Sequence, residues 1–239
     1  MKTRLDQKLV QNGLVSTRSQ AESYVKLGEV TVNQKVITKP GFLTSDTDQV
    51  MLNVKEQYVS RAALKLASVA EALKLDFINK TVLDVGSSTG GFTDYALQHG
   101  AKKVIAVDVG SDQLHPSLRE NPHIELHEKT DIRDFEVSEP IDLIVIDVSF
   151  ISLREILPAV AKLSSKRTLV AAMVKPQFEA GREKLKHKGV IKNDRLRREI
   201  LKNFEQWAGQ HFVVLSKADS DIKGAKGNQE RFYLLTLLS

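Results

Sequence analysis

The residues of this sequence that are best suited to chemistry stand where apolar stretches end. One stretch ends at Val85 and runs into the glycine-bearing loop Gly86–Gly91, and another ends at Val107 and is followed by Asp108. Such a loop can adopt positive φ angles and bring backbone N–H groups close to a ligand, and an acid in the place of Asp108 can accept hydrogen bonds from ribose hydroxyls. The glycine spacing fits neither GxGxxG nor a P-loop, which argues against a pyrophosphate. The two features predict a nucleoside-bearing cofactor such as S-adenosylmethionine, with a purely structural turn as the alternative.

Four further charged residues are candidates for a site. Asp147 and Lys175 each follow directly after a strand-sized apolar stretch. Because these stretches have the pattern of buried strands, a solvated surface explains their charged ends poorly. Lys65 and Glu230, in contrast, have on pattern alone the features of ordinary surface charges.

From residue 60 onward, helix-like and strand-like segments alternate. Strands are expected at Thr81–Val85, Lys103–Val107, Ile124–Leu126, Leu143–Asp147, Leu169–Val174, Phe212–Ser216 and Arg231–Leu237. Helices are expected at Ser60–Leu75, Gly91–Gln98, Ser152–Leu163 and Asp194–Trp207. Near-continuous apolar strands separated by helices indicate an α/β fold with a mostly parallel sheet covered on both faces. The last connection is short and lacks a helical pattern, so the last two strands are expected to be antiparallel.

The first 57 residues have a different pattern, which predicts a small α+β domain before a larger domain over 58–239. Two short helices are expected in it, the second over Arg18–Leu27, where Gly28 ends it. The segments Val30–Val32 and Lys35–Ile37 are then expected to form a tight hairpin.

Basic residues gather in two parts of the chain. Residues 1–40 hold seven Lys and Arg against three acids, and residues 182–198 hold eight against two. A solvated surface is the simple interpretation, and a phosphate-binding face for RNA is the sharper one. The candidates for RNA contact are Arg4, Lys8, Arg18, Lys26, Lys35, Lys184, Lys186 and Lys188.

The composition excludes several classes of protein. The chain has 239 residues, no cysteine and a net charge of +5, which rules out disulfide scaffolds, thiolate metal sites, Fe–S clusters and cysteine nucleophiles. No segment has the apolar length that a signal peptide or a membrane span requires, so we expect a soluble, cytoplasmic protein. His123 and His127 flank an expected strand without a third ligand, and no metal site is expected there.

These motifs occur together in one known family. The whole chain resembles the hemolysin A (TlyA) family of ribosomal RNA methyltransferases, with residues 1–57 similar to an S4 RNA-binding domain and residues 58–239 similar to an FtsJ-type 2′-O-methyltransferase domain. The motifs are Arg4-Leu5-Asp6, Thr17-Arg18-Ser19-Gln20-Ala21, Gly28-Glu29-Val30-Thr31-Val32-Asn33, Tyr58–Leu66, Leu83–Phe92, Val145–Leu153, Val174–Glu179 and Gly227–Glu230. The resemblance implies a Rossmann-like, seven-stranded, mostly parallel methyltransferase sheet with an antiparallel last strand, preceded by a small α+β S4 domain.

The resemblance also implies a catalytic tetrad. FtsJ-like enzymes use a Lys–Asp–Lys–Glu set, which is matched here by Lys65, Asp147, Lys175 and Glu230. We expect Lys175 to orient or deprotonate a ribose 2′-OH and Lys65 to stabilise the developing oxyanion. The two acids are expected to position the lysines.

The same resemblance implies S-adenosylmethionine as the cofactor. The residues expected around it are Asp84, Gly86, Ser88, Gly90, Asp108 and Asp131. The glycines and Ser88 are expected near its methionine part, Asp108 on its ribose and Asp131 near its adenine amino group. Asp84 is expected either to approach the methionine ammonium or to hold the loop.

Three functions are compatible with these observations to different degrees. The preferred hypothesis is 2′-O-methylation of a ribose, with cytidine as the base that the resemblance implies, in ribosomal RNA or a ribosomal subunit, without a membrane or a metal. A cytolysin, which the family name suggests, would need long membrane-active elements that the sequence lacks. A non-catalytic RNA-binding or ribosome-assembly factor would need neither the tetrad nor the cofactor loop.

Overall fold

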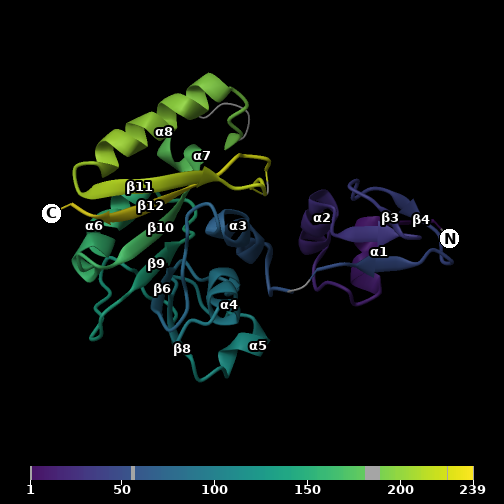
Figure 1. The fold of residues 1–239 in the computed structure, drawn as a ribbon, viewed down its shortest axis with the longest axis horizontal. Coiled ribbons are helices and arrows are strands. Elements are labelled where there is room, and N and C mark those ends of the chain that lie inside the picture. Colours follow the sequence, from purple (N-terminus) through teal and green to yellow (C-terminus); the bar gives the residue numbers. More distant parts are fainter. Residues whose placement is uncertain (1, 55–56, 181–188, 225, 239) are drawn as a thin grey trace. The chain divides into compact units, whose positions relative to one another are not determined.

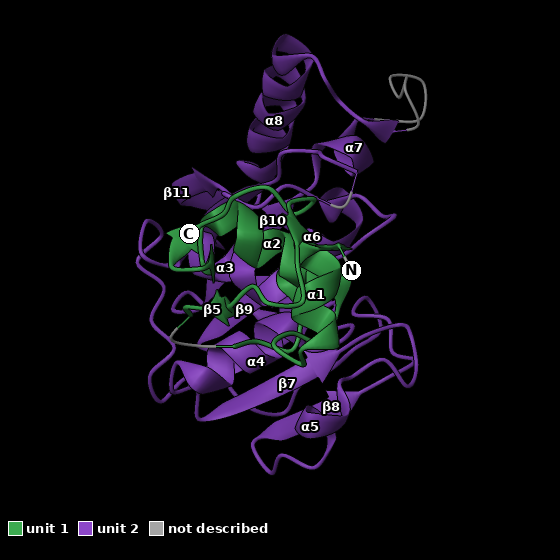
Figure 2. Cartoon of the chain, turned by 90° about the vertical axis from the view of Figure 1, so that its right-hand side faces the viewer, with its two compact units in different colours: residues 1–61 green, residues 62–239 purple. Residues whose placement is uncertain are grey.

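The chain folds into two compact units. A computed structural model describes residues 2–54, 57–180, 189–224 and 226–238. The units comprise residues 1–61 and 62–239 (Figure 2).

The first unit has an α+β architecture. Its elements are β1 (Thr3–Arg4), α1 (Leu5–Gln11), α2 (Arg18–Leu27), β2 (Val30–Val32), β3 (Lys35–Val36), β4 (Leu43–Thr44) and β5 (Val50–Leu52). The strands pair antiparallel in the orders β1-β4 and β3-β2-β5. Helix α2 begins where Thr17 accepts a hydrogen bond from the N–H of Gln20, and it ends at Gly28, whose φ is 81°. Asn33 and Gln34 have φ values of 49° and 66°, as a two-residue hairpin turn requires, so the expected hairpin is confirmed.

The second unit contains the larger sheet. Helix α3 (Arg61–Ala70) begins at the last residue of the first unit. The chain continues with β6 (Thr81–Val85), α4 (Gly91–Gln98), β7 (Lys103–Val107), α5 (Pro116–Arg119), β8 (Ile124–His127), β9 (Leu143–Ile146), α6 (Leu153–Leu163), β10 (Leu169–Val174), α7 (Pro176–Glu179), α8 (Asp194–Ala208), β11 (Phe212–Asp219) and β12 (Arg231–Leu237).

Seven strands form one sheet in the order β11-β12-β10-β9-β6-β7-β8 (Figure 1). Strands β6 to β10 pair in parallel, and β12 runs antiparallel to both β10 and β11. The expected Rossmann-like, mostly parallel sheet with an antiparallel last strand is therefore confirmed. The chain moves outward from β6 to β7 and β8 and then returns to place β9 on the other side of β6. Ligands bind beyond the carboxyl ends of strands at such a reversal of strand order.

Helices cover both faces of this sheet. Leu83 and Val85 of β6 belong to the apolar core that also contains residues of α6 and α8. Asp84 lies between them in the strand, and its side chain points to the opposite face, where Thr93 of α4 donates a hydrogen bond to it. The alternation of β6 thus places a carboxylate inside the molecule, next to the loop that follows the strand.

Several element boundaries differ from the sequence-based expectation. The helix expected over Ser60–Leu75 extends only over Arg61–Ala70, and β11 continues to Asp219, beyond the expected end at Ser216. Helices α5 and α7 were not expected from the sequence. Each has four residues and begins with a proline in its first turn, which is too short for a helical period to be visible.

None of the helices in the described part of the chain is long and apolar enough to cross a membrane. Within the described ranges, no group of three or more His, Cys, Asp or Glu side chains is arranged to hold a metal ion. The two histidines considered in the sequence have separate partners. His123 Nδ1 lies 3.0 Å from the carbonyl oxygen of Lys102, and His127 Nε2 lies 2.6 Å from Glu125 Oε1.

Candidate active site

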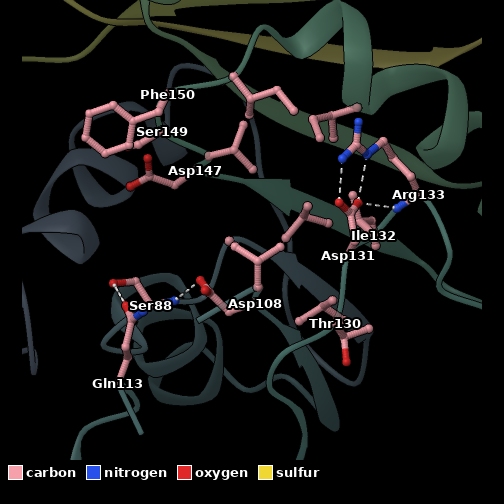
Figure 3. Close-up of a pocket in the computed structure, with 17 residues that line it drawn as sticks. Ser88, Asp108, Gln113, Thr130, Asp131, Ile132, Arg133, Asp147, Ser149 and Phe150 are labelled. Atoms are coloured by element: carbon pink, nitrogen blue, oxygen red, sulfur yellow. Dashed lines mark hydrogen bonds and ion pairs between the residues drawn. The ribbon is translucent and has the colours of Figure 1, made fainter. Parts of the chain in front are cut away.

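A pocket of about 530 Å³ opens at the carboxyl ends of β6, β7 and β9 (Figure 3). Apolar residues of the strands and of the loops that follow them form much of its wall. The polar residues around it are Ser88, Asp108, Gln113, Thr130, Asp131, Arg133, Asp147 and Ser149. An apolar pocket with a few polar groups is typical of small-molecule sites, and it lies at the reversal of strand order.

The loop after β6 requires glycine at two positions. Gly86 has a φ of 82°, and a Cβ added to it would lie 2.8 Å from the carbonyl oxygen of Asp147. Gly90 has a φ of 87°, and its added Cβ would lie 2.6 Å from two leucine side chains. A side chain at either position would displace the loop or its neighbours. The two glycines therefore allow the loop to pass close to the pocket.

Asp108 directly follows β7, and its carboxylate is fixed by backbone donors. Its Oδ2 accepts from the N–H of Ser88 at 2.8 Å, and its Oδ1 accepts from the N–H of Gly110 at 2.7 Å. Each carboxylate oxygen has a second acceptor position. A carboxylate held in this way at a pocket wall is suited to accept from the two hydroxyls of a ribose.

Asp131 forms a close pair with Arg133 on the side of the pocket away from Asp147 (Figure 3). Its Oδ1 accepts from the backbone N–H and the Nε of Arg133 at 2.9 and 3.0 Å, and its Oδ2 accepts from Nη2 at 2.6 Å. The hydrogen bonds from Arg133 hold the pKa of Asp131 below its usual value. The sequence reasoning missed this arginine, since only the folded loop brings its side chain back onto Asp131.

Asp84 is a buried carboxylate with one unused oxygen. The Thr93 hydroxyl donates to Oδ2 at 2.6 Å, whereas Oδ1 has no hydrogen-bond partner. Burial raises the pKa of Asp84 to about 7. Asp84 borders a second, smaller pocket of about 130 Å³, which Asp147 and Lys175 also line. A buried oxygen without a partner is rare in folded proteins, and this one is suited to receive an ammonium group.

The structure brings Asp147 and Lys175 into contact. Lys175 Nζ lies 2.5 Å from Asp147 Oδ1 and donates to Ser149 Oγ at 2.7 Å. The lysine and aspartate side chains are only 9% and 14% exposed. The two residues meet because they follow β10 and β9, which are paired in parallel and end at the same edge of the sheet.

Lys65 and Glu230 form a second ion pair. Lys65 Nζ, from α3, lies 2.5 Å from Glu230 Oε2, and these side chains are 8% and 3% exposed. Glu230 directly precedes Arg231, which pairs with Val174 of β10, so the strand register places Glu230 beside Lys175. The interpretation of Lys65 and Glu230 as ordinary surface charges is wrong, because packing of α3 and of the last hairpin buries both.

The four charges therefore stand at one end of the sheet as two lysine–carboxylate pairs. Burying a charge is costly unless a partner compensates it, and a buried pair is seldom worth more to stability than apolar residues of similar size. Charged groups that are kept inside a protein at the wall of a pocket are candidates for chemistry. This arrangement can hold a hydroxyl group, accept its proton and stabilise negative charge on its oxygen.

Besides Arg133, sequence reasoning missed two residues at this site. Ser149 accepts a hydrogen bond from Lys175, as described above, and the next residue, Phe150, is 91% exposed. Phe150 has a φ of 68° and packs against Phe178, with the ring centroids 5.4 Å apart. This backbone conformation is unfavourable for a bulky residue and points to a functional constraint. In the sequence, the only feature that could have indicated Phe150 was an aromatic residue three positions after Asp147.

In the first unit, Arg4 and Arg18 share one buried carboxylate. Arg4 Nη2 and Arg18 Nε lie 2.8 and 2.9 Å from Asp6 Oδ2, and Asp6 is fully buried. The arginine side chains are 42% and 50% exposed. Asp6 thus holds two guanidinium groups together while both remain open to solvent.

The other basic candidates have weaker partners. Lys8 lies 3.6 Å from Asp46, and Lys26 lies 3.7 Å from Glu22. Lys35 is exposed on β3. The remaining candidates lie outside the described residues: Lys184, Lys186 and Lys188.

Comparison with known proteins matches both parts of the chain. A model of the FtsJ-like methyltransferase family matches residues 58–237, and a model of the S4 domain matches residues 3–50. Hemolysin A of Brachyspira hyodysenteriae is 38% identical over 232 residues, which cover 95% of this chain and 97% of that protein. The 23S rRNA (cytidine-2′-O)-methyltransferase TlyA of Campylobacter jejuni is 43% identical over 190 residues, which cover 78% of this chain and 74% of that protein. A solved structure of a candidate hemolysin from Streptococcus thermophilus is 37% identical, with a TM-score of 0.75, and covers 100% of this chain and 89% of that one.

Proposed function

The chain belongs to the hemolysin A (TlyA) family, which joins an S4 domain to an FtsJ-like methyltransferase domain, and we propose that it transfers a methyl group from S-adenosylmethionine to a ribose 2′-oxygen in ribosomal RNA. The observation that carries this proposal is the pair of buried lysine–carboxylate contacts beside a pocket of nucleoside size. The name of the Campylobacter relative supports cytidine as the target base. A ribosomal substrate implies that the protein acts in the cytoplasm.

We propose that the larger pocket holds the nucleoside part of S-adenosylmethionine and that its methionine part extends toward the smaller pocket, because the residues present fit these parts. Asp108 would accept from the ribose hydroxyls, and the unused oxygen of Asp84 would accept from the methionine ammonium. Asp131 would border the adenine. When bound, the cofactor supplies an electrophilic methyl group on a sulfonium.

The protein's own task is then to prepare the ribose hydroxyl. A hydroxyl is a poor nucleophile at neutral pH and must lose its proton as it attacks. Lys175 borders the smaller pocket and is held by Asp147 and Ser149. In this proposal the neutral amine form of Lys175 Nζ orients the 2′-OH and receives its proton, which leaves an ammonium paired with Asp147. Lys65, held by Glu230, supplies a positive charge that stabilises the oxygen as it becomes negative.

The substrate side of the proposal rests on aromatic and basic residues. Sequence-specific RNA recognition uses bases that are removed from the stack and packed against aromatic rings, and the exposed ring of Phe150 beside the pocket is suited to this role. The guanidinium groups of Arg4 and Arg18 would contact RNA phosphates, with Lys8, Lys26 and Lys35 extending this surface.

Methylation by a Lys175→Ala variant tests the proposal. General acid–base groups contribute about 10²- to 10⁴-fold to rate, so we expect a loss of that size with S-adenosylmethionine affinity unchanged. Lys103→Ala is the matched control, because Lys103 pairs with Glu125 and Glu139 at the start of β7, the opposite end of the sheet. Activity is measured on ribosomal particles, and 2′-O-methyl positions are mapped in rRNA from cells with and without the protein.

Two outcomes would contradict parts of this proposal. Methylation at the normal rate by Lys175→Ala would overturn the tetrad assignment. Binding of RNA by the wild-type protein with no methylation and no affinity for S-adenosylmethionine would instead establish a non-catalytic RNA-binding factor.

A further inference from the structure

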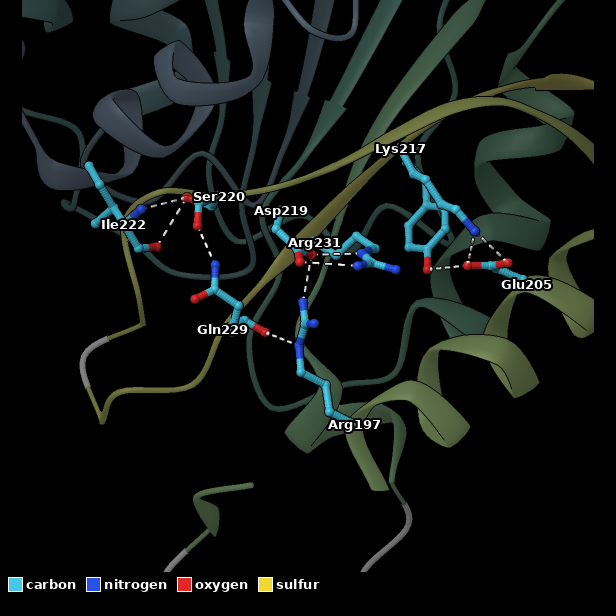
Figure 4. Close-up of polar contacts among 9 residues, drawn as sticks. Arg197, Glu205, Lys217, Asp219, Ser220, Ile222, Gln229 and Arg231 are labelled. Atoms are coloured by element: carbon cyan, nitrogen blue, oxygen red, sulfur yellow. Dashed lines mark hydrogen bonds and ion pairs between the residues drawn. The ribbon is translucent and has the colours of Figure 1, made fainter. Parts of the chain in front are cut away.

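Glu230 lies between two residues that one cluster of charges holds in place (Figure 4). Arg231, which follows it, donates from Nε and Nη2 to the two oxygens of Asp219 at 2.6 and 3.0 Å. Arg197 of α8 donates from Nη2 to Asp219 at 2.6 Å and from Nε to the carbonyl oxygen of Gln229 at 3.2 Å. Arg197 thus contacts the chain on both sides of Glu230. It bonds the backbone of Gln229 directly, and it bonds the Asp219 carboxylate that also holds Arg231.

The cluster is partly shielded from solvent and carries compensating charges. Arg197 is 13% exposed and Arg231 is 23% exposed, with Asp219 between them. Burial raises the pKa of Asp219, but the hydrogen bonds from Arg231 and Arg197 outweigh it and lower the pKa below its ordinary value. Charge-assisted hydrogen bonds of this kind are stronger than neutral ones and fix geometry through the planar guanidinium.

The loop before Glu230 also leaves its carboxylate little freedom. A Cβ added to Gly224 would lie 2.7 Å from Glu230 Oε1, so the carboxylate packs directly against the loop backbone. The N–H of Ser220 donates to the carbonyl oxygen of Glu230 at 3.1 Å. The side chain of Gln229 donates to the carbonyl oxygen of Ser220. Both the main chain and the carboxylate of Glu230 are therefore constrained.

The same loop is bonded to the helix that carries Lys65. Ser68, one turn further along α3, donates from Oγ to the carbonyl oxygen of Lys65 at 2.7 Å. The N–H of Asp221 in turn donates to Ser68 Oγ at 3.3 Å. The loop thus constrains both residues of the Lys65–Glu230 pair. It packs against the carboxylate of Glu230, and through Ser68 it is bonded to the backbone of Lys65 in α3.

We propose that Arg197 and Asp219 are positioning residues for the Lys65–Glu230 pair: by fixing Gln229 and Arg231 they fix Glu230 and, through it, the ammonium of Lys65. This inference rests on the proposed methyltransferase function. It also assigns a different role to one residue of the basic segment 182–198, since the Arg197 guanidinium is used inside the protein rather than on an RNA surface.

A second cluster in Figure 4 provides a matched control. Lys217 of β11 donates to both oxygens of Glu205 of α8 at 2.8 and 2.9 Å, and the Tyr233 hydroxyl donates to Glu205 at 2.8 Å. This cluster also joins α8 to the last two strands, but none of its members is next to Glu230. Removing Lys217 therefore perturbs the same packing without touching the neighbours of Glu230.

The test compares Arg197→Ala and Asp219→Asn with Lys217→Ala. Small displacements of a catalytic group can cost up to about 10²-fold in rate, so we expect the first two variants to lose roughly 10- to 100-fold in the single-turnover methylation rate. Their KM for RNA and their affinity for S-adenosylmethionine should stay at the wild-type values. Arg197→Lys should recover only part of the rate, because an ammonium cannot reproduce the two-pronged geometry of the guanidinium. Lys217→Ala should keep the wild-type rate, as an exposed pair contributes little.

A hydrogen-exchange measurement separates failure of this inference from failure of the proposed function. The amides of Gln229 to Arg231 should exchange faster in Arg197→Ala and at the wild-type rate in Lys217→Ala, whether or not RNA is methylated. Unchanged exchange in Arg197→Ala would overturn the inference even if the wild type is active. An equal loss of rate and of Tm in Arg197→Ala and Lys217→Ala would also overturn it, because the role would then be structural only.

Discussion

Asp6 in the first unit and Asp84 in the second are both completely buried, yet their carboxylates are in opposite electrostatic situations. Burial raises the pKa of Asp6, but hydrogen bonds from Arg4 and Arg18 outweigh burial and lower it below its ordinary value. Burial of Asp84 is offset only in part by the hydroxyl and the backbone of Thr93, and its pKa rises to about 7. Asp6 is paired with the guanidinium groups of Arg4 and Arg18, whereas no cationic side chain is paired with Asp84 in the described part of the chain.

The contrast is consistent with the separate roles proposed for the two units. Asp6 directs two half-exposed guanidinium groups outward, which suits binding of an anionic backbone. Asp84 and the two lysine–carboxylate pairs are instead largely buried, where water screens their charges little. Salt screens exposed charges, so binding that depends on them weakens as the salt concentration rises. Buried charges have shifted pKa values, so a reaction that depends on them varies with pH.

Among the variants that test this comparison, the largest effect is expected at Asp84. Asp84→Asn removes the charge proposed to pair with the methionine ammonium, and loss of one partner of a buried charge pair costs about 2–5 kcal/mol. We expect the S-adenosylmethionine affinity to fall by roughly 30-fold or more, as measured by calorimetry. Thr93→Val, which keeps the carboxylate and removes only its donor, should have a smaller effect. An unchanged affinity in Asp84→Asn would place the ammonium elsewhere.

Asp6→Ala should destabilise the first unit, because two arginines lose the carboxylate that holds them. Loss of a buried hydrogen-bonding partner costs about 1–3 kcal/mol, and since both arginines are half-exposed we expect the lower part of that range in urea denaturation. A folded-state pKa below the unfolded value gives stability that is present above the unfolded pKa and is lost as the pH falls through the folded pKa. The wild type should therefore lose this contribution in acid, and Asp6→Ala should show no such loss.

The pH dependence of Asp84 should have the opposite sign. Its pKa is raised to about 7, so its protonated form favours folding, and its contribution to the stability of the ligand-free protein should decline as the pH rises from about 4 to about 7. S-adenosylmethionine should bind the ionised form, with an affinity that falls by at most about tenfold per pH unit below the pKa. Calorimetric titrations at several pH values test this, and a pH profile that Asp84→Asn shares with the wild type would contradict it.

The smallest effect is expected for Arg18→Ala. Removing one phosphate contact should weaken RNA binding and reduce the salt slope of the binding constant by about one, with the methylation rate at saturating RNA unchanged. Lys175→Ala should leave that slope at its wild-type value. Equal slopes in Arg18→Ala and the wild type would remove Arg18 from the proposed RNA surface.

The sequence was most informative where local pattern decides structure. The apolar strands and their connections predicted the sheet, and the rule that ligands bind at strand ends identified Asp108, Asp147 and Lys175 as candidates. All three line the pockets at that edge of the sheet. Their places follow from strand order alone, without any side-chain contact.

The remaining features depend on contacts between distant parts of the chain. Pattern alone indicated a surface role for Lys65 and Glu230, because their burial arises only when α3 and the last hairpin pack together. The same holds for Arg197, which lies in a basic segment but pairs with Asp219, 22 residues away in sequence. The φ of Phe150 is a property of the folded loop, and no residue type in its neighbourhood indicates it.

The division of the chain into two compact units has a kinetic consequence. Once one unit has bound a large substrate, the encounter of the other becomes intramolecular, and linked binding of this kind can reach effective concentrations in the millimolar range. Each unit can then bind weakly on its own while the whole chain binds tightly. The two weakly bound units can also dissociate one after the other. A protein of this kind can therefore bind its substrate selectively and still release the product quickly before it binds the next substrate.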